Sequence, residues 1–305
     1  MRSSVLLATG PGFTLDAVTC VDDHRGWSPV ETNPRYRVVL VRRGMFRRKA
    51  DGRSAVADPT MAYLAAPGEE EHFAHPAGGD VCTSLSLSPH LWRMLSGEDA
   101  RTTRSTVYVD ARLDLAHRRV LSAARGGDTD FAVAESLLPL IGAALAQAAD
   151  CPPEAADSRP RATTGRPCAT TGHPGAATGR PCATTGRPGP AASRTSAAIV
   201  GAAREAITAG HPAAGGLLSL AEFLEVSPYR LSRAFTRELG ISLTHYRNRV
   251  RVGRALDRLE NGEPSLATLA ADLGFADQAH LTRTIRRHVG HTPTALRRLL
   301  APRDP

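Results

Sequence analysis

A heptad that repeats four times near the middle of the chain divides this sequence into two halves. Its units are ATTGRPC, ATTGHPG, AATGRPC and ATTGRPG, and they begin at Ala162, Ala169, Ala176 and Ala183. Every unit contains Gly and Pro and none contains a large apolar residue, so the segment cannot bury enough surface to offset its chain entropy. Its glycines recur mainly every seventh residue, which excludes the three-residue period of collagen. We therefore predict a disordered linker over residues 151–192, with folded parts on either side.

Charge is distributed unequally between these parts. The chain has 305 residues and a net charge of +8. Residues 193–305 carry 16 basic and 10 acidic side chains, a net +6, whereas residues 1–150 carry 17 basic and 18 acidic side chains, a net −1. A basic excess confined to the C-terminal part favours a polyanionic partner for that part.

Composition argues against several classes of protein. The most apolar long stretch, Phe131–Ala149, contains Glu135 and Gln147 and is typical of an amphipathic helix, so we expect no segment to span a bilayer. The first eight residues lack the full hydrophobic region of a signal peptide, which favours a cytoplasmic protein without a membrane partner. Five cysteines are an odd number, and Cys168 and Cys182 fall within the heptad repeat, so we interpret these two as unpaired thiols and expect no disulfide framework.

Short strands are predicted before the linker. Arg35–Arg43 and Tyr63–Leu64 have strand-like composition, and residues 81–87 alternate between apolar and polar with a period of two. Turn signals such as Asp51-Gly52 and Pro67-Gly68 separate these segments. Strands of this length and spacing favour a small β-barrel or sandwich over residues 12–90.

The pattern becomes helical after residue 110. Apolar residues recur at helical spacing on either side of Gly126-Gly127, which predicts an antiparallel helix pair within residues 111–150. Such a pair packs against the barrel or against a second subunit.

The C-terminal part contains an internal repeat displaced by 50 positions. The residues of the first copy are Leu231, Arg233, Arg237, Gly240, Thr244 and Arg247, and those of the second are Leu281, Arg283, Arg287, Gly290, Thr294 and Arg297. A duplicated structural unit explains this register better than chance.

Helix-end signals mark each copy as two helices joined by a tight turn. In the first copy, Ser219 and Glu222 predict a capping box, and Ser227 with Pro228 starts a second helix after the turn Glu225–Ser227. In the second copy, Ser265 and Asp277 are the predicted N-caps and Gly274 lies in the turn. This helix-turn-helix geometry presents a second helix to the major groove of DNA.

One helix over Thr244–Leu259 is predicted between the copies. It would be about 24 Å long at 1.5 Å per residue. With the flanking units added, the two recognition helices would lie about 34 Å apart, which is one turn of DNA. The binding sites should therefore be long, and asymmetric because two unlike helices read them.

The C-terminal sequence resembles a known family. The runs VSPYRLSRAFTRELGISLTHYR, RVGRAL and LATLAADLGFADQAHLTRTIRRHVGHTPTALR, with the GF pair, the D-Q-x-H-L-x-R segment and the G-x-T-P close, are similar to the AraC/XylS DNA-binding domain over residues 193–300. Glu225 stands where that family usually has Gly, and Leu281, Ile285 and Leu296 stand where aromatic residues are frequent. The apolar exchanges leave packing little changed, whereas Glu225 adds a negative charge near DNA.

The N-terminal sequence resembles the sensing domain of the same regulators. The run RYRVVLVRRGMFRRKADGRSAVADPTMAYLAAPGEEEHFAHPAGGDVCTSL is similar to their cupin-like domain, which implies a sensing domain over residues 1–110 and a dimerising helix pair over residues 111–150. The expected fold class is thus multi-domain α+β, with a cupin-like β-barrel and a helical pair followed by an all-α domain of two helix-turn-helix units.

For DNA contacts we choose the exposed N-terminal faces of the two recognition helices. Arg pairs with guanine, Gln with adenine, and Thr and Ala methyl groups meet thymine. The expected base-reading residues are Tyr229, Arg230, Ser232, Arg233 and Thr236 in the first unit, and Gln278, Ala279, His280, Thr282 and Arg283 in the second. Arg237, Arg286 and Arg287 lie further along and are expected to contact phosphates. A solvated basic face is the alternative interpretation of these residues.

Core positions are expected on the opposite faces of the helices, at Leu231, Phe235, Leu269, Phe275, Leu281 and Ile285.

Donors for a metal occur in the predicted barrel. They are Cys20, His24, His72, His75 and Cys82. The spacings Cys20-x3-His24 and His72-x2-His75 differ from the two-His one-Glu arrangement of metal cupins, so satisfied or exposed histidines are the default and no metal or other cofactor is expected. No nucleophile motif, P-loop or dinucleotide fingerprint occurs, which disfavours an enzyme.

These expectations combine into a cytoplasmic transcription regulator. Its C-terminal domain would bind double-stranded promoter DNA, its barrel a small effector, and its output would recruit or obstruct RNA polymerase, with a homodimer as a further possibility. Two alternatives stay open. One is a metal-dependent cupin enzyme tethered to DNA by the C-terminal domain, and the other is a regulator whose barrel only dimerises.

Overall fold

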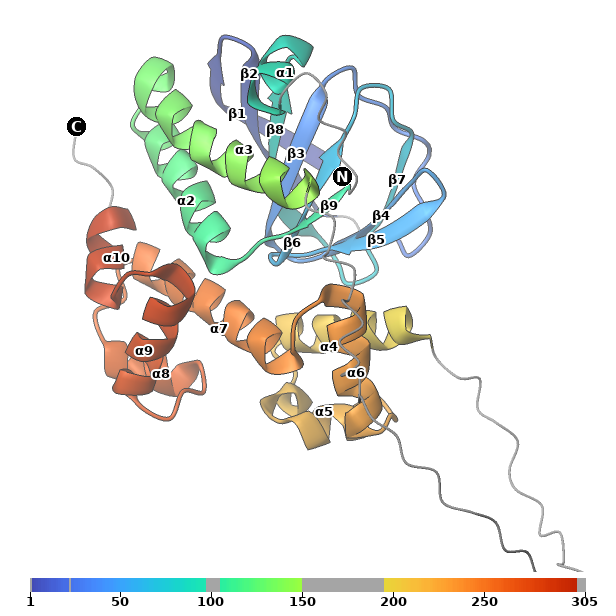
Figure 1. The fold of residues 1–305 in the computed structure, drawn as a ribbon, viewed down its shortest axis with the longest axis vertical. Coiled ribbons are helices and arrows are strands. Elements are labelled where there is room, and N and C mark those ends of the chain that lie inside the picture. Colours follow the sequence, from blue (N-terminus) through green and yellow to red (C-terminus); the bar gives the residue numbers. More distant parts are fainter. Residues whose placement is uncertain (1, 22, 97–104, 150–194, 301–305) are drawn as a thin grey trace, which may run out of the picture.

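A computed structural model describes residues 2–21, 23–96, 105–149 and 195–300 of the chain. The predicted linker lies outside these ranges. The described residues form an N-terminal β-domain, helices packed on it and a C-terminal helical domain, which confirms the expected multi-domain α+β fold (Figure 1).

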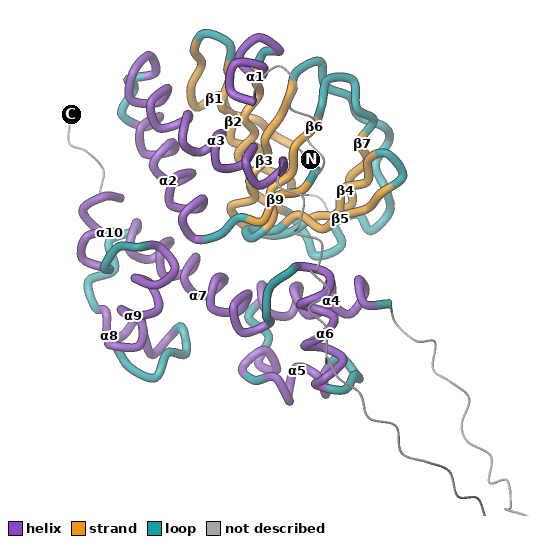
Figure 2. The backbone as a smooth tube through the Cα atoms, viewed as in Figure 1, coloured by secondary structure: helices purple, strands orange, loops and turns teal. Residues whose placement is uncertain are grey.

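Two antiparallel sheets form the N-terminal domain. The larger sheet has the strand order β1-β2-β8-β3-β6-β9, and the smaller has the order β5-β4-β7. Val39, Phe46, Tyr63 and Phe73 belong to one buried apolar cluster of this domain. Figure 2 shows the strands of the domain in orange, with the helices α1, α2 and α3 beside them in purple. The strands are β1 (Arg2–Gly10), β2 (Phe13–Cys20), β3 (Tyr36–Arg43), β4 (Phe46–Ala50), β5 (Arg53–Ala57), β6 (Met61–Ala65), β7 (Glu71–Ala74), β8 (Asp80–Leu87) and β9 (Thr106–Tyr108).

The β-domain is larger than the barrel predicted over residues 12–90. Strand β1 pairs with β2 at one edge of the large sheet, and β9 pairs with β6 at the other. Most of β1 is exposed, so its residues lack the apolar and polar alternation that marks a half-buried strand. Strand β9 has only three residues and is too short for a periodic pattern.

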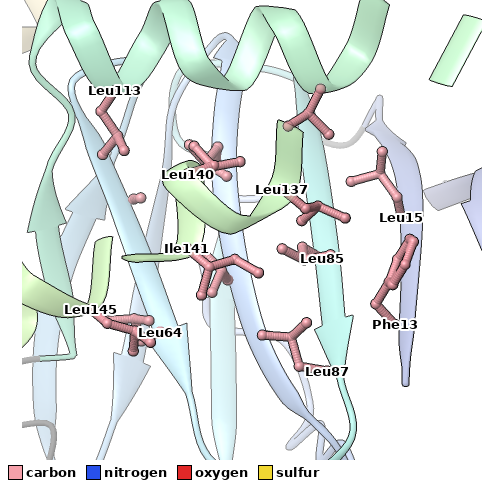
Figure 3. Close-up of a cluster of buried hydrophobic side chains, with 14 of the residues drawn as sticks. Phe13, Leu15, Leu64, Leu85, Leu87, Leu113, Leu137, Leu140, Ile141 and Leu145 are labelled. Atoms are coloured by element: carbon pink, nitrogen blue, oxygen red, sulfur yellow. The ribbon is translucent and has the colours of Figure 1, made fainter. Parts of the chain in front are cut away.

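Helices cover the outer face of the large sheet. They are α1 (Pro89–Ser96), α2 (Ala111–Arg125), the short π-helix η1 (Thr129–Val133) and α3 (Ala134–Ala149). The predicted pair is confirmed as α2 and α3, and Asp110 caps α2 by accepting hydrogen bonds from the backbone N–H groups of Arg112 and Leu113. Figure 3 shows Leu137, Leu140 and Ile141 of α3 facing Leu85 and Leu87 of β8 in the resulting core.

Helix α3 differs in one respect from the sequence expectation. By length and composition alone, Phe131–Ala148 is long and apolar enough to cross a membrane, so the expectation that no segment qualifies is wrong. One such helix is weak support for a membrane span, because core helices pass the same test. Here Leu140, Ile141 and Ala148 are almost completely buried against the sheet.

The C-terminal domain is wholly helical among the described residues. Its elements are α4 (Ser196–Ala209), the 3-10 turn η2 (Pro212–Gly215), α5 (Leu217–Phe223), α6 (Pro228–Leu239), α7 (Leu243–Glu260), α8 (Leu266–Asp272), α9 (Gln278–Val289) and α10 (Pro293–Leu300). One core joins α4, α5, α6 and the start of α7, and a second joins the end of α7 with α8, α9 and α10. All six predicted core residues of the two units are buried.

Most predicted helix caps are present. The side chains of Ser227, Ser265 and Asp277 accept hydrogen bonds from backbone N–H groups at the starts of α6, α8 and α9. The predicted capping box of α5 is wrong, because α5 begins two residues before Ser219 and its N-cap is Gly216. The Ser219 hydroxyl instead donates to the carbonyl oxygens of Ala213 and Gly216, which ties α5 to the preceding turn.

Candidate nucleic-acid interface and barrel cavity

The two helix-turn-helix turns have nearly the same backbone. In the first, Glu225 has a φ of 55° and the Val226 N–H donates to the Ala221 carbonyl across 3.0 Å. In the second, Gly274 has a φ of +71° and the Phe275 N–H donates to the Ala270 carbonyl across 2.9 Å. These hydrogen bonds end α5 and α8 in the left-handed C-terminal geometry and direct the chain into α6 and α9.

Helix α7 connects the two units. It has 18 residues, two more than the sequence predicts, and is therefore about 27 Å long. Ser242 caps its start by accepting from the His245 N–H. Because α7 contributes Tyr246 to the first core and Leu256 to the second, it fixes the spacing between α6 and α9.

The structure places the predicted DNA-facing residues on the surface. Those that are exposed are Tyr229, Arg230, Arg233, Thr236, Arg237, Gln278, Ala279, Arg283, Arg286 and Arg287, and those that are partly exposed are Ser232, His280 and Thr282. Each recognition helix thus buries one face in its own unit and leaves a basic face exposed in the described part of the chain.

Within the first unit, two of these side chains support each other. The Arg233 guanidinium donates to the Tyr229 hydroxyl across 3.0 Å and lies 5.4 Å from the centre of the tyrosine ring. Tyr229 is 70% exposed, so the pair projects from the start of α6. Because the aromatic ring already orients the guanidinium, the arginine would lose less side-chain entropy when it contacts a base.

His280 in the second unit has a structural role that the sequence did not indicate. Its Nδ1 accepts a hydrogen bond from the Ala276 N–H across 3.3 Å, and its ring lies edge-on to Phe275. Gln278, Ala279 and Arg283 therefore have more freedom than His280 to contact bases.

A second candidate site is a cavity of about 410 Å³ inside the N-terminal barrel. Apolar side chains such as Val39, Phe46 and Phe73 line one part of it. Polar side chains line another part, and Arg37 among them is already paired with the buried Glu71. A mostly apolar hollow with a few convergent polar groups is typical of a small-molecule site.

Four of the five predicted metal donors line this cavity. Cys20, His24, His75 and Cys82 surround it, together with Asp80, which the sequence interpretation missed. His72 does not line it, because its Nδ1 is 2.9 Å from the Ser28 carbonyl oxygen. Asp80 lies two residues before Cys82 on β8. Because side chains two residues apart in a strand lie on the same face, this spacing could have added Asp80 to the predicted donors.

Short contacts connect this cluster. The Cys20 Sγ lies 3.6 Å from His75 Nε2, and Cys82 Sγ donates to Asp80 Oδ2 across 2.9 Å. His75 Nδ1 lies 2.8 Å from Asp80 Oδ1, yet neither atom has a hydrogen bond of acceptable geometry within the described residues. The His24 ring is 5.0 Å from the His75 ring, and its buried Nε2 likewise lacks a hydrogen-bond partner within those ranges.

Burial sets the protonation of the cluster. It raises the pKa of the Cys20 and Cys82 thiols, and the Asp80 charge adds to both shifts. Burial also lowers the pKa of His75, against the opposing effect of Asp80. In the chain without a ligand, the thiols and the imidazole are therefore neutral at pH 7.

The barrel and the C-terminal domain meet at a polar interface centred on Asp58. This completely buried carboxylate follows β5 and forms an ion pair with Arg204 of α4 at 2.6 Å. It also accepts hydrogen bonds from the Tyr246 hydroxyl of α7 at 3.0 Å and from the Thr60 N–H at 2.7 Å. One barrel residue thus holds both the first helix of the domain and the connecting helix.

Arg249 of α7 makes a second set of contacts across this interface. It is buried and donates to the Val109 carbonyl at 2.8 Å and the Pro59 carbonyl at 3.2 Å, and it lies 3.1 Å from Asp114 of α2. Burial alone would raise the pKa of Asp114, but Arg249 and Arg118 outweigh it and lower that pKa. Asp114 therefore stays ionised at the junction of barrel, helix pair and α7.

Two helix-turn-helix units with exposed basic recognition faces, held by one connecting helix, define a DNA-binding domain. Comparison with known proteins agrees. Residues 220–299 match the family model described as a helix-turn-helix domain.

Similar proteins are transcription regulators in this region. The chain is 32% identical over 81 residues to the arabinose operon regulatory proteins of Salmonella typhimurium and Escherichia coli, which is 27% of this chain and 29% and 28% of theirs. It is 30% identical over 83 residues to the bifunctional transcriptional activator/DNA repair enzyme AdaA of Bacillus subtilis, 27% of this chain and 39% of that protein. Residues 220–299 are thus a helix-turn-helix domain that is similar to part of these regulators, and the chain spans less than two fifths of the relatives' length.

Solved structures similar to the chain fall into two groups. The C-terminal domain of AraT, a response regulator from Geobacillus stearothermophilus, is 34% identical, with 33% of this chain and 84% of that one covered and a TM-score of 0.31. A cupin superfamily protein from Desulfitobacterium hafniense is 12% identical, with 29% of this chain and 78% of that one covered and a TM-score of 0.26.

Proposed function

We propose that the protein is a sequence-specific transcription regulator that binds promoter DNA through α6 and α9 and binds a small effector in its barrel. One observation carries the proposal: α7 fixes two helix-turn-helix units whose recognition helices both leave a basic face exposed. The two faces differ in sequence, so the operator would be asymmetric and would span two successive major grooves.

Roles follow from the chemistry of the exposed side chains. Arg233 and Arg283 stand at equivalent positions and are the proposed guanine-reading residues, and Gln278 suits adenine. Arg237, Arg286 and Arg287, further along the helices, are the proposed phosphate contacts that set the register. RNA polymerase, recruited or obstructed at the promoter, is the proposed partner of the bound regulator in the cytoplasm.

The proposed route from effector to DNA is the Asp58 interface. Asp58 lies at the end of β5 and contacts α4 and α7, which carry the first unit. A ligand that favours one position of the β5–β6 turn would alter the docking of that unit, and the coupling would act in both directions.

A fluorescence anisotropy titration of the full chain with DNA from its own upstream region tests the proposal. Arg233→Ala and Arg283→Ala should each weaken specific binding by about 1–3 kcal/mol. Arg93→Ala, which removes an exposed arginine from α1, is the matched control and should leave the affinity unchanged. Equal affinity for a scrambled duplex, or no effect of either recognition-helix variant, would refute the proposed function.

The enzyme alternative is favoured by one observation, the Cys, His and Asp cluster in the barrel cavity. The two interpretations predict different effects of a barrel ligand. A regulator requires that the ligand change the affinity for DNA, whereas a tethered enzyme requires turnover and no change in that affinity.

A further inference from the structure

The cluster in the barrel cavity has the composition of a soft-metal site. Cys20, His75 and Asp80 each offer a buried ligand atom, and the three atoms lie within 4.8 Å of one another. A thiolate, an imidazole and a carboxylate together suit Zn²⁺, whereas Mg²⁺ and Ca²⁺ prefer oxygen donors alone.

The separation of two of the donors matches a zinc site closely. The Cys20 Sγ and His75 Nε2 are 3.6 Å apart. With Zn–S of about 2.3 Å and Zn–N of about 2.0–2.1 Å, tetrahedral geometry requires these two ligands to be about 3.6 Å apart. A single Zn²⁺ could therefore bind both atoms with little movement of either strand.

Unsatisfied polar atoms around the cluster supply an independent observation. His24 Nε2 is buried and lacks a hydrogen bond within the described part of the chain, whereas His75 Nδ1 and Asp80 Oδ1 are buried and face each other across 2.8 Å without good hydrogen-bond geometry. Buried polar atoms without partners are unfavourable and are rare in native proteins. One unsatisfied imidazole nitrogen beside a His75–Asp80 contact of poor hydrogen-bond geometry indicates a ligand at this point of the cavity.

The surrounding contacts fix the donors in place. Cys20 and Asp80 are direct partners in the β2–β8 ladder, and the His75 N–H donates to the His24 carbonyl across 2.8 Å. Cys82 donates its S–H to the second oxygen of Asp80. This support orients the carboxylate as outer-shell groups do in zinc proteins.

We propose that the barrel binds one Zn²⁺ through Cys20, His75 and Asp80, with His24 as the fourth ligand, and that this zinc is an effector of the regulator. The site itself stands on the barrel geometry, and its regulatory role rests on the proposed function. Binding releases the Cys20 thiol proton to solvent, since the thiolate is the ligand. His72 does not line the cavity and is not part of the proposed site.

Zinc affinity of the purified full chain is measured first, by competition with a chromophoric chelator and without DNA. One equivalent is expected, with binding weakened at least about tenfold by Cys20→Ser, Asp80→Asn or His24→Gln. The variant His24→Gln is expected to fold, because His24 is partly exposed and its Nε2 makes no hydrogen bond that the variant would lose. A loss of zinc affinity in this variant therefore reports on the site and not on misfolding. With Co²⁺ in place of zinc, the thiolate charge-transfer absorption should disappear in Cys20→Ser.

Two controls keep the result specific to the barrel. His90→Gln changes an exposed histidine of α1, and Cys168→Ser with Cys182→Ser removes the heptad thiols. All should retain one equivalent of zinc. The proposal is overturned if the wild-type chain binds no zinc, or if the heptad double variant loses it while Cys20→Ser does not.

The affinity for DNA is measured second, once with zinc and once with a chelator. This measurement separates the proposed regulator from the proposed zinc site. Specific DNA binding without any zinc binding leaves the regulator standing and rejects the zinc site. One equivalent of zinc without specific DNA binding supports the site and rejects the regulator. Zinc binding with unaltered affinity for a specific operator rejects the effector role.

Discussion

At the scale of single residues, Glu225 holds a backbone conformation that favours glycine. Its φ is 55°, and a left-handed conformation costs an L residue about 1–2 kcal/mol. The equivalent turn of the second unit has Gly274 in the same conformation. The first unit therefore carries strain that the second lacks.

Replacing Glu225 by Gly should stabilise the C-terminal domain by about 1 kcal/mol, because the strain relieved exceeds the flexibility that glycine adds to the unfolded chain. Urea denaturation of the full chain, followed by helical circular dichroism, measures the change. Gly274→Ala is the matched control and should destabilise by a similar amount. A lower denaturation midpoint in Glu225→Gly would contradict this account of the turn.

His117 links stability to pH. It is buried beside the barrel, with its Nε2 2.8 Å from the Thr83 hydroxyl, and burial lowers its pKa from 6.5 to about 4. Because the unfolded chain binds the proton more readily, the contribution of the neutral ring is complete above pH 6.5 and is lost as the pH falls to about 4. The shift corresponds to about 3 kcal/mol at 1.4 kcal/mol per pKa unit.

His117→Gln should therefore flatten the pH dependence of unfolding between pH 6.5 and 4. Glutamine retains a polar group for Thr83 but does not titrate. Urea midpoints of wild type and variant across this range provide the measurement, with His90→Gln as the control that keeps the wild-type slope. If the variant loses stability on acidification as steeply as wild type, another group is responsible.

Sequence patterns specified some residues of the sites and missed others for physical reasons. The helices α6 and α9 were predictable because helical period, caps and a 50-residue repeat all agree, and the assignment of their exposed faces to DNA remains a proposal. Asp80 was missed because it joins Cys20 only through the β2–β8 pairing, which sequence does not reveal. Asp58 was missed because its partners, Arg204 and Tyr246, are more than 140 residues away.

At the scale of elements, α7 was predictable from the sequence and β1 was not. The 18 residues of α7 bury one regular stripe in two cores, so the helix was predicted to within one residue at either end. Strand β1 is an exposed edge strand whose pairing with β2 determines it, so its sequence has little periodicity. Elements stabilised by their own buried face are predictable, whereas those stabilised by a neighbour are not.

Helix α3 leaves part of an apolar surface exposed. Leu138 is 52% exposed, and Phe131 of the preceding turn is 79% exposed. Because the sequence resembles regulators with a dimerising helix pair, we propose that this outer face is the contact of a homodimer.

Leu138→Glu should then weaken the dimer, because a carboxylate would be buried between subunits without a partner. Sedimentation equilibrium of wild type and variant measures the dissociation constant. Glu135→Gln, an exposed change one turn away on the same helix, should have little effect. Equal masses for wild type and Leu138→Glu at all concentrations would exclude this face as the contact.

At the scale of the whole molecule, buried ion pairs hold the barrel and the helix pair against the C-terminal domain. Asp58, Arg204 and Arg249 are almost completely buried at the interface, so the two parts cannot separate without leaving charges unpaired. The recognition faces of α6 and α9 stay exposed in the same arrangement. The proposed DNA-contacting side chains are therefore exposed while the two parts are docked, and under the proposed function a ligand of the barrel would act on α4 and α7 through Asp58.

Asp58→Asn tests this route. Asparagine keeps the size of the side chain but leaves the Arg204 guanidinium buried without its counter-charge, a defect of about 3–5 kcal/mol in buried ion pairs. The C-terminal domain should undock from the barrel while its own cores persist, which hydrogen exchange would detect as increased exchange confined to the α4, α7 and β5–β6 segments. Specific DNA binding should remain, because Asp58 lies outside both recognition faces, but its dependence on zinc should disappear. Glu135→Gln is the control for a charge change outside the interface, and a variant that keeps the wild-type zinc dependence would show that the signal bypasses Asp58.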